Sequence, residues 1–169
     1  MKLTVAFFGH RNIYCKDIED RMKSQLSSII TDEVVCLIGQ HGDFDRIALS
    51  VCRNVRKSYP QIHITVVFTS LNVLIRGRNG DCSIADCYSD VDTMIYDIEE
   101  EYFKKQIIVS NRKMVDESDL IICYVDMKKQ SSGAKQAVEY AMKKGKKIIN
   151  LFKEQDRLSY DELRKALGL

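Results

Sequence analysis

The sequence has little of what usually interrupts or cross-links a chain. It contains one proline, no tryptophan and eight glycines in 169 residues. Its apolar runs are far shorter than the about 20 residues of a membrane-spanning helix, so we expect no contact with a membrane. The first apolar segment begins directly after Lys2 and no small-residue cleavage site follows it. We therefore expect a cytoplasmic protein.

An excess of one charge is also missing. The chain carries 26 Lys and Arg against 24 Asp and Glu, a formal net charge of +2. This near balance argues against a surface dedicated to coating nucleic acid, so a nucleic-acid partner is not expected. Apolar residues make up 45% of the chain, enough for a substantial core. The length and composition predict one domain over residues 1–169.

The familiar signatures of cofactor binding are absent. There is no Gly-x-Gly-x-x-Gly, no Gly-x-x-x-x-Gly-Lys-Ser/Thr and no Gly-x-Ser-x-Gly. A standard dinucleotide fold, a P-loop and a hydrolase nucleophile elbow are therefore disfavoured. We expect no tightly bound cofactor.

The six cysteines do not indicate a metal centre. Cys36, Cys52 and Cys123 lie inside apolar segments, where a free cysteine behaves as a small hydrophobic residue. Cys82 and Cys87 lie in a polar stretch, but their spacing lacks the second pair or the histidines that zinc requires. We expect no metal site.

Apolar runs alternate with segments of helical spacing along the chain. The predicted strands are 3–8, 34–38, 62–68, 93–98, 120–125 and 147–152. The predicted helices are 16–30, 44–58, 101–117, 133–144 and 159–167, the last capped by Ser159 with Glu162 at the capping-box position. Residues 69–92 have no clear period and are interpreted as a long loop. This alternation predicts an α/β, Rossmann-like, three-layer fold with a mostly parallel sheet of about six strands and helices on both faces.

The stretch that follows the second strand has the pattern of an anion-binding corner. An apolar run ends at Gly39, Gly42 follows, and a helical pattern begins at Phe44. A strand, a glycine-containing turn and a helix N-terminus present outward-pointing N–H groups that suit a phosphate or a carboxylate.

Three polar residues in this corner have open interpretations. Asp43 and Asp45 can cap the helix, or one of them can bind the hydroxyls of a ribose. His41 is a phosphate donor, a proton donor or only a turn residue. Nothing in the local sequence decides among these alternatives.

Two further turns are expected at the same edge of the sheet. Gly9, His10 and Arg11 follow the first strand, and Ser131, Ser132 and Gly133 lie beyond the fifth. Ligands of parallel sheets bind outside the C-terminal strand ends, so the three turns should meet in one site. Arg11 offers a fork of donors for phosphate, or is simply solvated. The serines supply hydroxyls and N–H groups to a ligand, or only cap a helix.

With these residues in view, the chain resembles the SLOG superfamily, which joins the DNA-processing protein DprA (SMF) to the cytokinin-activating LOG proteins. It is most similar to small stand-alone bacterial members, on Phe8-Gly9-His10-Arg11 and on Gly39-Gln40-His41-Gly42-Asp43-Phe44-Asp45-Arg46. Asn111-Arg112-Lys113 resembles the Arg-containing helix of the family, and the resemblance covers about residues 3–152. It implies a fold that binds nucleotides or nucleotide-derived ligands.

The resemblance also implies catalytic residues for one branch of the superfamily. LOG-type enzymes hydrolyse the N-glycosidic bond of nucleoside monophosphates with an Arg and with a Glu in Pro-Gly-Gly-x-Gly-Thr-x-x-Glu. Here these correspond to Arg112 and Glu139, with Asn111 beside the Arg. Ser131, Ser132, Lys135 and Gln136 replace consensus residues of the second motif, and the lost glycines hinder close approach of the backbone to a phosphate. Glu139 is equally compatible with a solvated helix residue next to Lys135 and Lys143.

Three functions follow from these features. We expect a sensor or binding protein for a nucleotide-derived small molecule, because the early binding motifs are intact and the Glu motif is degraded. The first alternative is a LOG-like N-glycosidase, a hydrolase. The second is DprA-like binding of single-stranded DNA. A homodimer through the helix at 101–117 is also compatible with the sequence.

Overall fold

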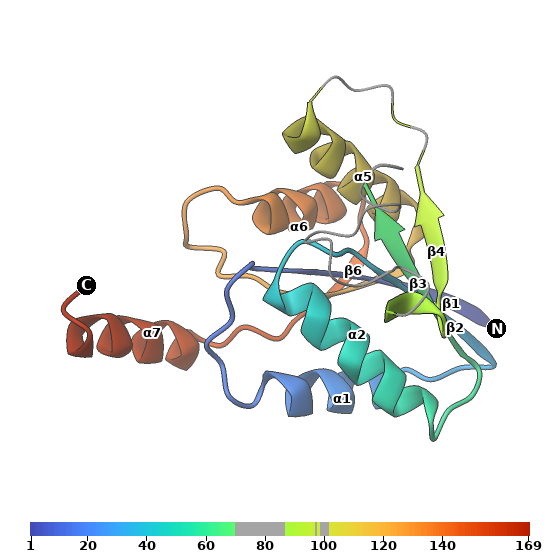
Figure 1. The fold of residues 1–169 in the computed structure, drawn as a ribbon, viewed down its shortest axis with the longest axis horizontal. Coiled ribbons are helices and arrows are strands. Elements are labelled where there is room, and N and C mark those ends of the chain that lie inside the picture. Colours follow the sequence, from blue (N-terminus) through green and yellow to red (C-terminus); the bar gives the residue numbers. More distant parts are fainter. Residues whose placement is uncertain (70–86, 97, 99–101) are drawn as a thin grey trace.

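Six parallel strands form the centre of the molecule (Figure 1). The computed structural model describes residues 1–69, 87–96, 98 and 102–169, without the side chains of 158–160. The strands are β1 (Lys2–Gly9), β2 (Glu33–Ile38), β3 (Ile62–Phe68), β4 (Asp92–Ile95), β5 (Leu120–Tyr124) and β6 (Lys147–Asn150). Their order in the sheet is β4-β3-β2-β1-β5-β6, and every pairing is parallel. The predicted α/β, Rossmann-like class is confirmed.

Helices cover both faces of this sheet, as the sequence predicts (Figure 1). The covering helices are α1 (Ile18–Ser28) and α2 (Asp43–Arg56) on one face and α5 (Phe103–Glu117) and α6 (Gly133–Lys143) on the other, and α7 (Glu154–Ala166) follows the last strand. The side chains of β1 alternate between the faces: Val5 and Phe7 belong to the core formed with α1 and α2. Ala6 and Phe8 belong to the core formed with α5 and α6. Central strands buried on both faces explain why the sequence shows continuous apolar runs.

The sheet reverses its winding direction at β1. The chain proceeds from β1 through β2 and β3 to β4 on one side, and then places β5 on the other side of β1. Phe7 pairs with Ile38 of β2 and with Ile122 of β5, so the C-terminal ends of all three strands lie together. Such a reversal opens a crevice where the crossovers diverge.

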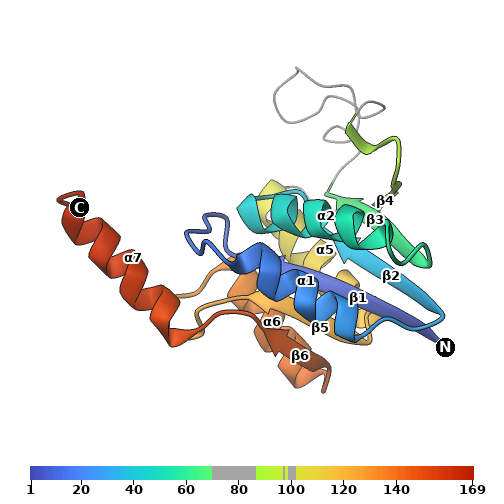
Figure 2. The same ribbon diagram turned by 90° about the horizontal axis from the view of Figure 1, so that it is seen from below.

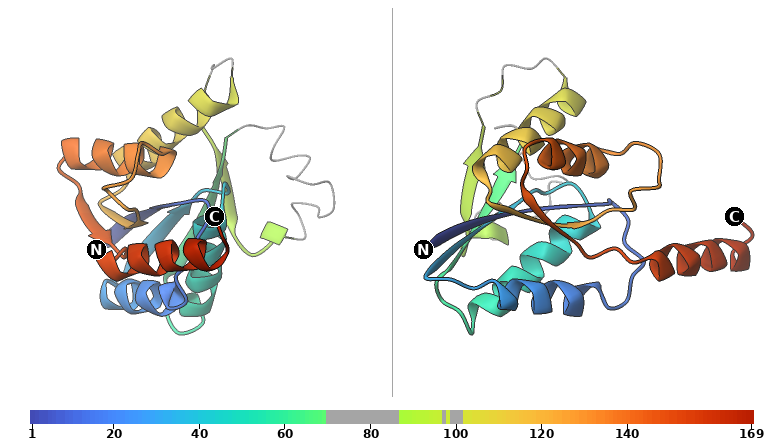
Figure 3. Two further views of the ribbon diagram at one scale, coloured as in Figure 1. Left: turned by 90° about the vertical axis from the view of Figure 1, so that its left-hand side faces the viewer. Right: turned by 180° about the vertical axis from the view of Figure 1, so that it is seen from behind.

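The last helix departs from the prediction. α7 begins at Glu154 instead of Ser159, and the N–H of Lys153 donates to Asp156 Oδ2 at 2.9 Å. Ser159 and Glu162 therefore lie inside the helix and not at its cap. The helix extends away from the sheet and its covering helices (Figures 2 and 3).

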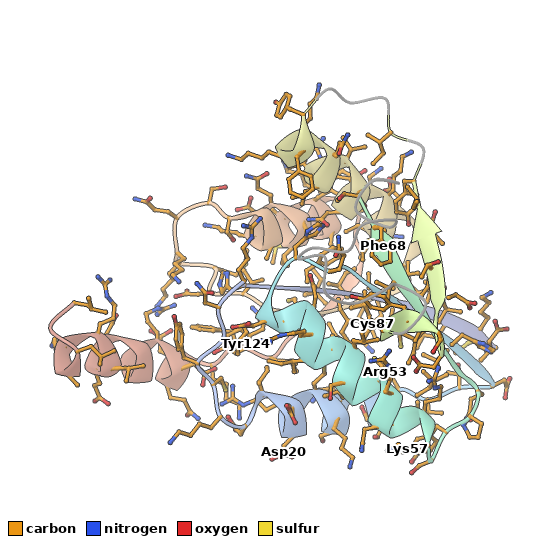
Figure 4. The ribbon with its side chains drawn as sticks, viewed as in Figure 1. Asp20, Arg53, Lys57, Phe68, Cys87 and Tyr124 are labelled. Atoms are coloured by element: carbon orange, nitrogen blue, oxygen red, sulfur yellow. The ribbon has the colours of Figure 1, made fainter. Side chains whose placement is uncertain are left out.

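The long segment at 69–92 is described only in part, because residues 70–86, with Cys82 among them, lie outside the described residues. The last residues of this segment are hydrogen-bonded to side chains of α2. Arg53 of α2 and Cys87 lie close together (Figure 4), and Arg53 donates to the carbonyl oxygen of Cys87 at 2.7 Å. Both Arg53 and Arg56 pair with Asp90 at 2.7 Å. These contacts lead the chain directly into β4, which ends at Ile95 instead of the predicted 98.

No helix in the described part of the chain has the length and apolar content that crossing a membrane requires.

Candidate functional site

A cavity of about 890 Å³ lies at the C-terminal ends of β1 and β5, and α5, α6 and α7 contribute to its walls. It is lined by ten of the thirteen residues predicted to bind a ligand. These are Gly9, His10, Arg11, Gly39, His41, Gly42, Asp45, Asn111, Ser132 and Gly133. The structure thus brings the three predicted turns together at one edge of the sheet.

Two glycines of the site are needed for packing within the protein. A Cβ built on Gly9 would lie 2.1 Å from Cγ of Phe44, and one built on Gly42 would lie 2.6 Å from Cα of Arg11. Because Gly42 lies so close to Arg11, the backbone N–H of Asp43 can donate to the carbonyl of Arg11 at 2.7 Å. The turn after β1 is thereby fixed against the start of α2.

Asp45 organises the turn after β2. Its Oδ2 accepts a hydrogen bond of 2.7 Å from the N–H of His41 and lies 3.1 Å from the Cβ position of Gly39. The ring of His41 meets Phe103 edge-on, with ring centroids 5.9 Å apart. Asp45 therefore shapes the corner from within. It does not cap α2, whose N-cap residue is Gly42 and has no side-chain cap hydrogen bond, so the capping interpretation is not met by this residue.

His10 joins the ends of β1 and β5. Its ring Nε2 accepts the backbone N–H of Asp126 at 2.9 Å, and the backbone N–H of His10 donates to the carbonyl of Tyr124 at 3.3 Å. Burial lowers the pKa of His10, and the nearby Lys129 lowers it further, while Asp126 acts in the opposite direction. The imidazole is therefore held neutral, with its remaining proton on Nδ1.

Asp126 is a buried carboxylate in the wall of the cavity that sequence reasoning missed. It accepts hydrogen bonds from Arg157, one of them 2.8 Å long, and from the N–H of Lys128 at 3.0 Å. The Arg157 guanidinium keeps the pKa of Asp126 below its usual range. Asp126 directly follows the apolar run of β5, so the rule that found the other strand ends would have found it too.

The start of α6 closes the other side of the cavity. Ser132 caps the helix, because its Oγ accepts the N–H of Lys135 at 3.2 Å. A Cβ built on Gly133 would meet nothing within 4 Å, and its backbone borders the cavity. Unlike Gly9 and Gly42, Gly133 has no internal packing requirement, and it leaves the helix N-terminus accessible.

Four of the residues predicted to bind or act on a ligand do not line the cavity, and each contacts another side chain of the protein. The first two are Asp43 and Ser131. Asp43 accepts from the N–H of Ile13 at 3.3 Å and pairs with Arg46, and Ser131 accepts from Gln136 at 3.0 Å.

Arg112 and Glu139, which were assigned a catalytic role by resemblance, also do not line the cavity. Arg112 lies over the ring of Tyr140, 5.4 Å from its centroid. Glu139 is half exposed and lies 4.0 Å from Lys135. The structure does not bring them to the cavity.

Positive charge exceeds negative charge among the described lining residues. The cations are Arg11, Lys104, Lys128, Lys129, Arg157 and Arg164, and the carboxylates are Asp45, Asp126, Asp156 and Asp161. Asp126 and Asp156 are already engaged by Arg157 and Arg21. The cavity is suited to an anionic ligand.

Other predicted features lie elsewhere. Among the apolar residues of α5, Met114 and Val115 are buried in the core, Ile107 and Ile108 border the cavity, and Phe103 is exposed. Within the described ranges, no three His, Cys, Asp or Glu side chains are grouped so as to hold a metal ion. Cys15, Cys36, Cys52 and Cys123 are free thiols.

Comparison with known proteins agrees with this architecture. The sequence model described as the YspA SLOG family matches residues 2–156. No match was found among curated proteins.

Two solved structures of DNA processing protein A (DprA) are similar in fold. The protein from Streptococcus pneumoniae has a TM-score of 0.60 at 17% identity, over 86% of this chain and 49% of that one. The protein from Helicobacter pylori, whose description concerns its single-stranded DNA binding mode, has a TM-score of 0.60 at 19% identity, over 86% and 63% of the two chains. The chain thus spans about half to two thirds of these structures.

Proposed function

Because the chain belongs to the YspA SLOG family, we propose that it binds a nucleotide or nucleotide-derived ligand at the C-terminal edge of its sheet, as a sensor or binding protein. The predicted membership of the SLOG superfamily is confirmed by this match and by the DprA-like fold.

The observation that carries the proposal is the convergence of Arg11, Gly42 and Gly133 on one cavity of about 890 Å³ at the winding reversal. This volume lies in the upper part of the roughly 300–1,000 Å³ range of small-molecule sites. The accessible N-terminus of α6 and the excess of cations favour phosphate. The neutral His10 and the buried Asp126 provide polar groups for the remainder of a nucleotide.

Calorimetric titration with AMP, GMP, CMP, NAD and ADP-ribose tests the proposal. We expect at least one of them to bind, and Gly133→Ala to weaken that binding by about fivefold or more, because the new methyl group obstructs the approach of phosphate to the helix N-terminus. Lys143→Ala is the matched control, since Lys143 is exposed on the same helix and lies outside the cavity. Absence of binding by the wild type for all of these compounds refutes the proposal.

The N-glycosidase alternative requires a separate assay. Release of free base from AMP, GMP, CMP or isopentenyl-AMP by the wild type, lost in Glu139→Ala, supports hydrolysis. Binding without release supports a sensor. The position of Glu139 outside the cavity, next to Lys135, favours the second outcome.

Binding of single-stranded DNA is the second candidate, and the similarity to the H. pylori DprA structure favours it. The cationic lining of the cavity is compatible with a phosphate backbone. Binding of an oligonucleotide that weakens steeply with added salt supports this function, whereas absence of such binding excludes it.

A further inference from the structure

One face of α5 forms a largely apolar wall of the cavity. Ile107, Ile108, Asn111 and Met114 all border the cavity, and their spacing places them on one side of the helix. Met114 is buried in the core, and the two isoleucines are half-buried. Lys104, one turn before them, adds a charge at the exposed start of the helix. Asn111 is therefore an amide set among three apolar side chains.

The amide of Asn111 is not used within the protein. The residue is half-buried, and no residue that the structure describes forms a hydrogen bond with its side chain. Neighbouring polar side chains of the lining are engaged: Ser132 caps α6, and Gln136 donates its amide N–H to Ser131 at 3.0 Å. Asn111 thus keeps both its donor and its acceptor for a molecule in the cavity.

An apolar wall that carries an amide suits a flat ring with hydrogen-bonding groups at its edge. Proteins bind extruded nucleobases in this way, with apolar side chains against the ring and polar groups at the base edge. An amide offers a donor beside an acceptor, and adenine offers the matching pair twice, as N6–H with N7 and as N6–H with N1. The corresponding N7 edge of guanine has two acceptors, so an amide can satisfy only one of them.

The wall lies beside the helix whose N-terminus is accessible to phosphate. α5 and α6 cover the same face of the sheet, and Met114 belongs to one core cluster with Ala137 and Val138 of α6 (Figure 1). Asn111 and Gly133 border the same cavity. One nucleotide can therefore use both helices.

We propose that α5 binds the base of the ligand, that Asn111 hydrogen-bonds the edge of this base, and that the base is adenine. This inference rests on the proposed function, because it takes the cavity to be a nucleotide site. It makes Asn111 the residue that distinguishes an adenine nucleotide from ligands that share only its sugar and phosphate.

Calorimetric titrations with AMP, N6,N6-dimethyl-AMP and GMP test the inference. We expect the wild type to bind AMP most tightly and the dimethylated nucleotide, which lacks the N6–H donor, about fivefold to tenfold more weakly. Asn111→Leu keeps the wall apolar and removes the amide. In this variant the affinity for AMP should fall by about tenfold, to within about twofold of that for the dimethylated nucleotide.

Asn54→Leu is the matched control. Asn54 is exposed on α2 and does not border the cavity, so the same substitution there should change neither affinity.

The outcomes separate this inference from the proposed function. Three results overturn the inference and leave nucleotide binding intact: equal affinity of the wild type for AMP and its dimethylated form, GMP binding as tight as AMP binding, or equal losses in the two Leu variants. A wild type that binds another nucleotide of the calorimetric panel but not AMP does the same. A wild type that binds none of the panel overturns the proposed function itself.

A second measurement does not depend on the folding of a variant. In isotope-labelled wild type, the side-chain NH2 resonances of Asn111 should shift saturably as AMP is added, because the amide gains hydrogen-bond partners. Saturable AMP binding that leaves these resonances unmoved overturns the role of Asn111.

Discussion

The contrast between Gly9 and Gly133 gives the sharpest prediction about how the site is built. A methyl group added at Gly9 would overlap the ring of Phe44, with contacts of 2.1 Å to Cγ and 2.6 Å to Cβ and Cδ1. Phe44 is only 1% exposed, so its ring cannot swing into solvent without leaving a cavity in the core. Overpacking of this kind costs about 1–3 kcal/mol, and overlap with a buried ring places Gly9→Ala near the upper end, about 3 kcal/mol.

Gly133→Ala is the internal comparison. No atom lies within 4 Å of the added methyl, and the residue begins α6, so we expect the stability to be unchanged or to rise by up to about 1 kcal/mol. Urea unfolding followed by circular dichroism at 222 nm measures both variants, since the chain has no tryptophan for fluorescence. A Gly9→Ala variant within about 0.5 kcal/mol of the wild type would refute the packing explanation of this glycine.

Three further perturbations test the contacts around the site. Arg21→Ala leaves the buried carboxylate of Asp156 without its cation, which costs about 3–5 kcal/mol of stability, so hydrogen exchange in α7 should accelerate strongly. Lys23→Ala, on the exposed side of α1, should leave that exchange unchanged. The Arg157 guanidinium lowers the pKa of Asp126, so the stability from this pair is present above about pH 4 and is lost as the pH falls below it. In urea titrations, Asp126→Asn should therefore lose less unfolding free energy on acidification than the wild type does. Burial lowers the pKa of His10, so its contribution is complete above about pH 6.5 and is lost at lower pH; His10→Gln, whose amide oxygen can still accept an N–H, should remove that loss between pH 7 and 5.

The sheet was predictable because its central strands are buried on both faces. A strand buried on both faces is apolar at every position, so runs such as 34–38 and 120–125 can be told apart from the helical spacing of the neighbouring segments. The start of α7 was not predictable in the same way. Asp156 looks like an ordinary acidic residue in the sequence, and only the fold shows that it caps the helix and binds Arg21 of a distant segment.

The site was predictable in outline, because the carboxyl ends of parallel strands meet at one edge. The roles of individual residues were not. Gly9 and Gly42 match a ligand-binding motif, yet the structure explains both by contacts with Phe44 and Arg11. Asp126 belongs to no recognisable motif, and its pairing depends on Arg157 of α7, the last helix of the chain.

The most direct test of nucleotide binding at this edge is a titration of isotope-labelled protein with AMP, followed by the backbone amide resonances. We predict that the largest shifts occur at the three turns, near Arg11, Gly42 and Gly133, and that the far end of the sheet, around Lys2 and Glu33, remains unchanged. Shifts confined to another surface, or no saturable shifts at all, would contradict the account.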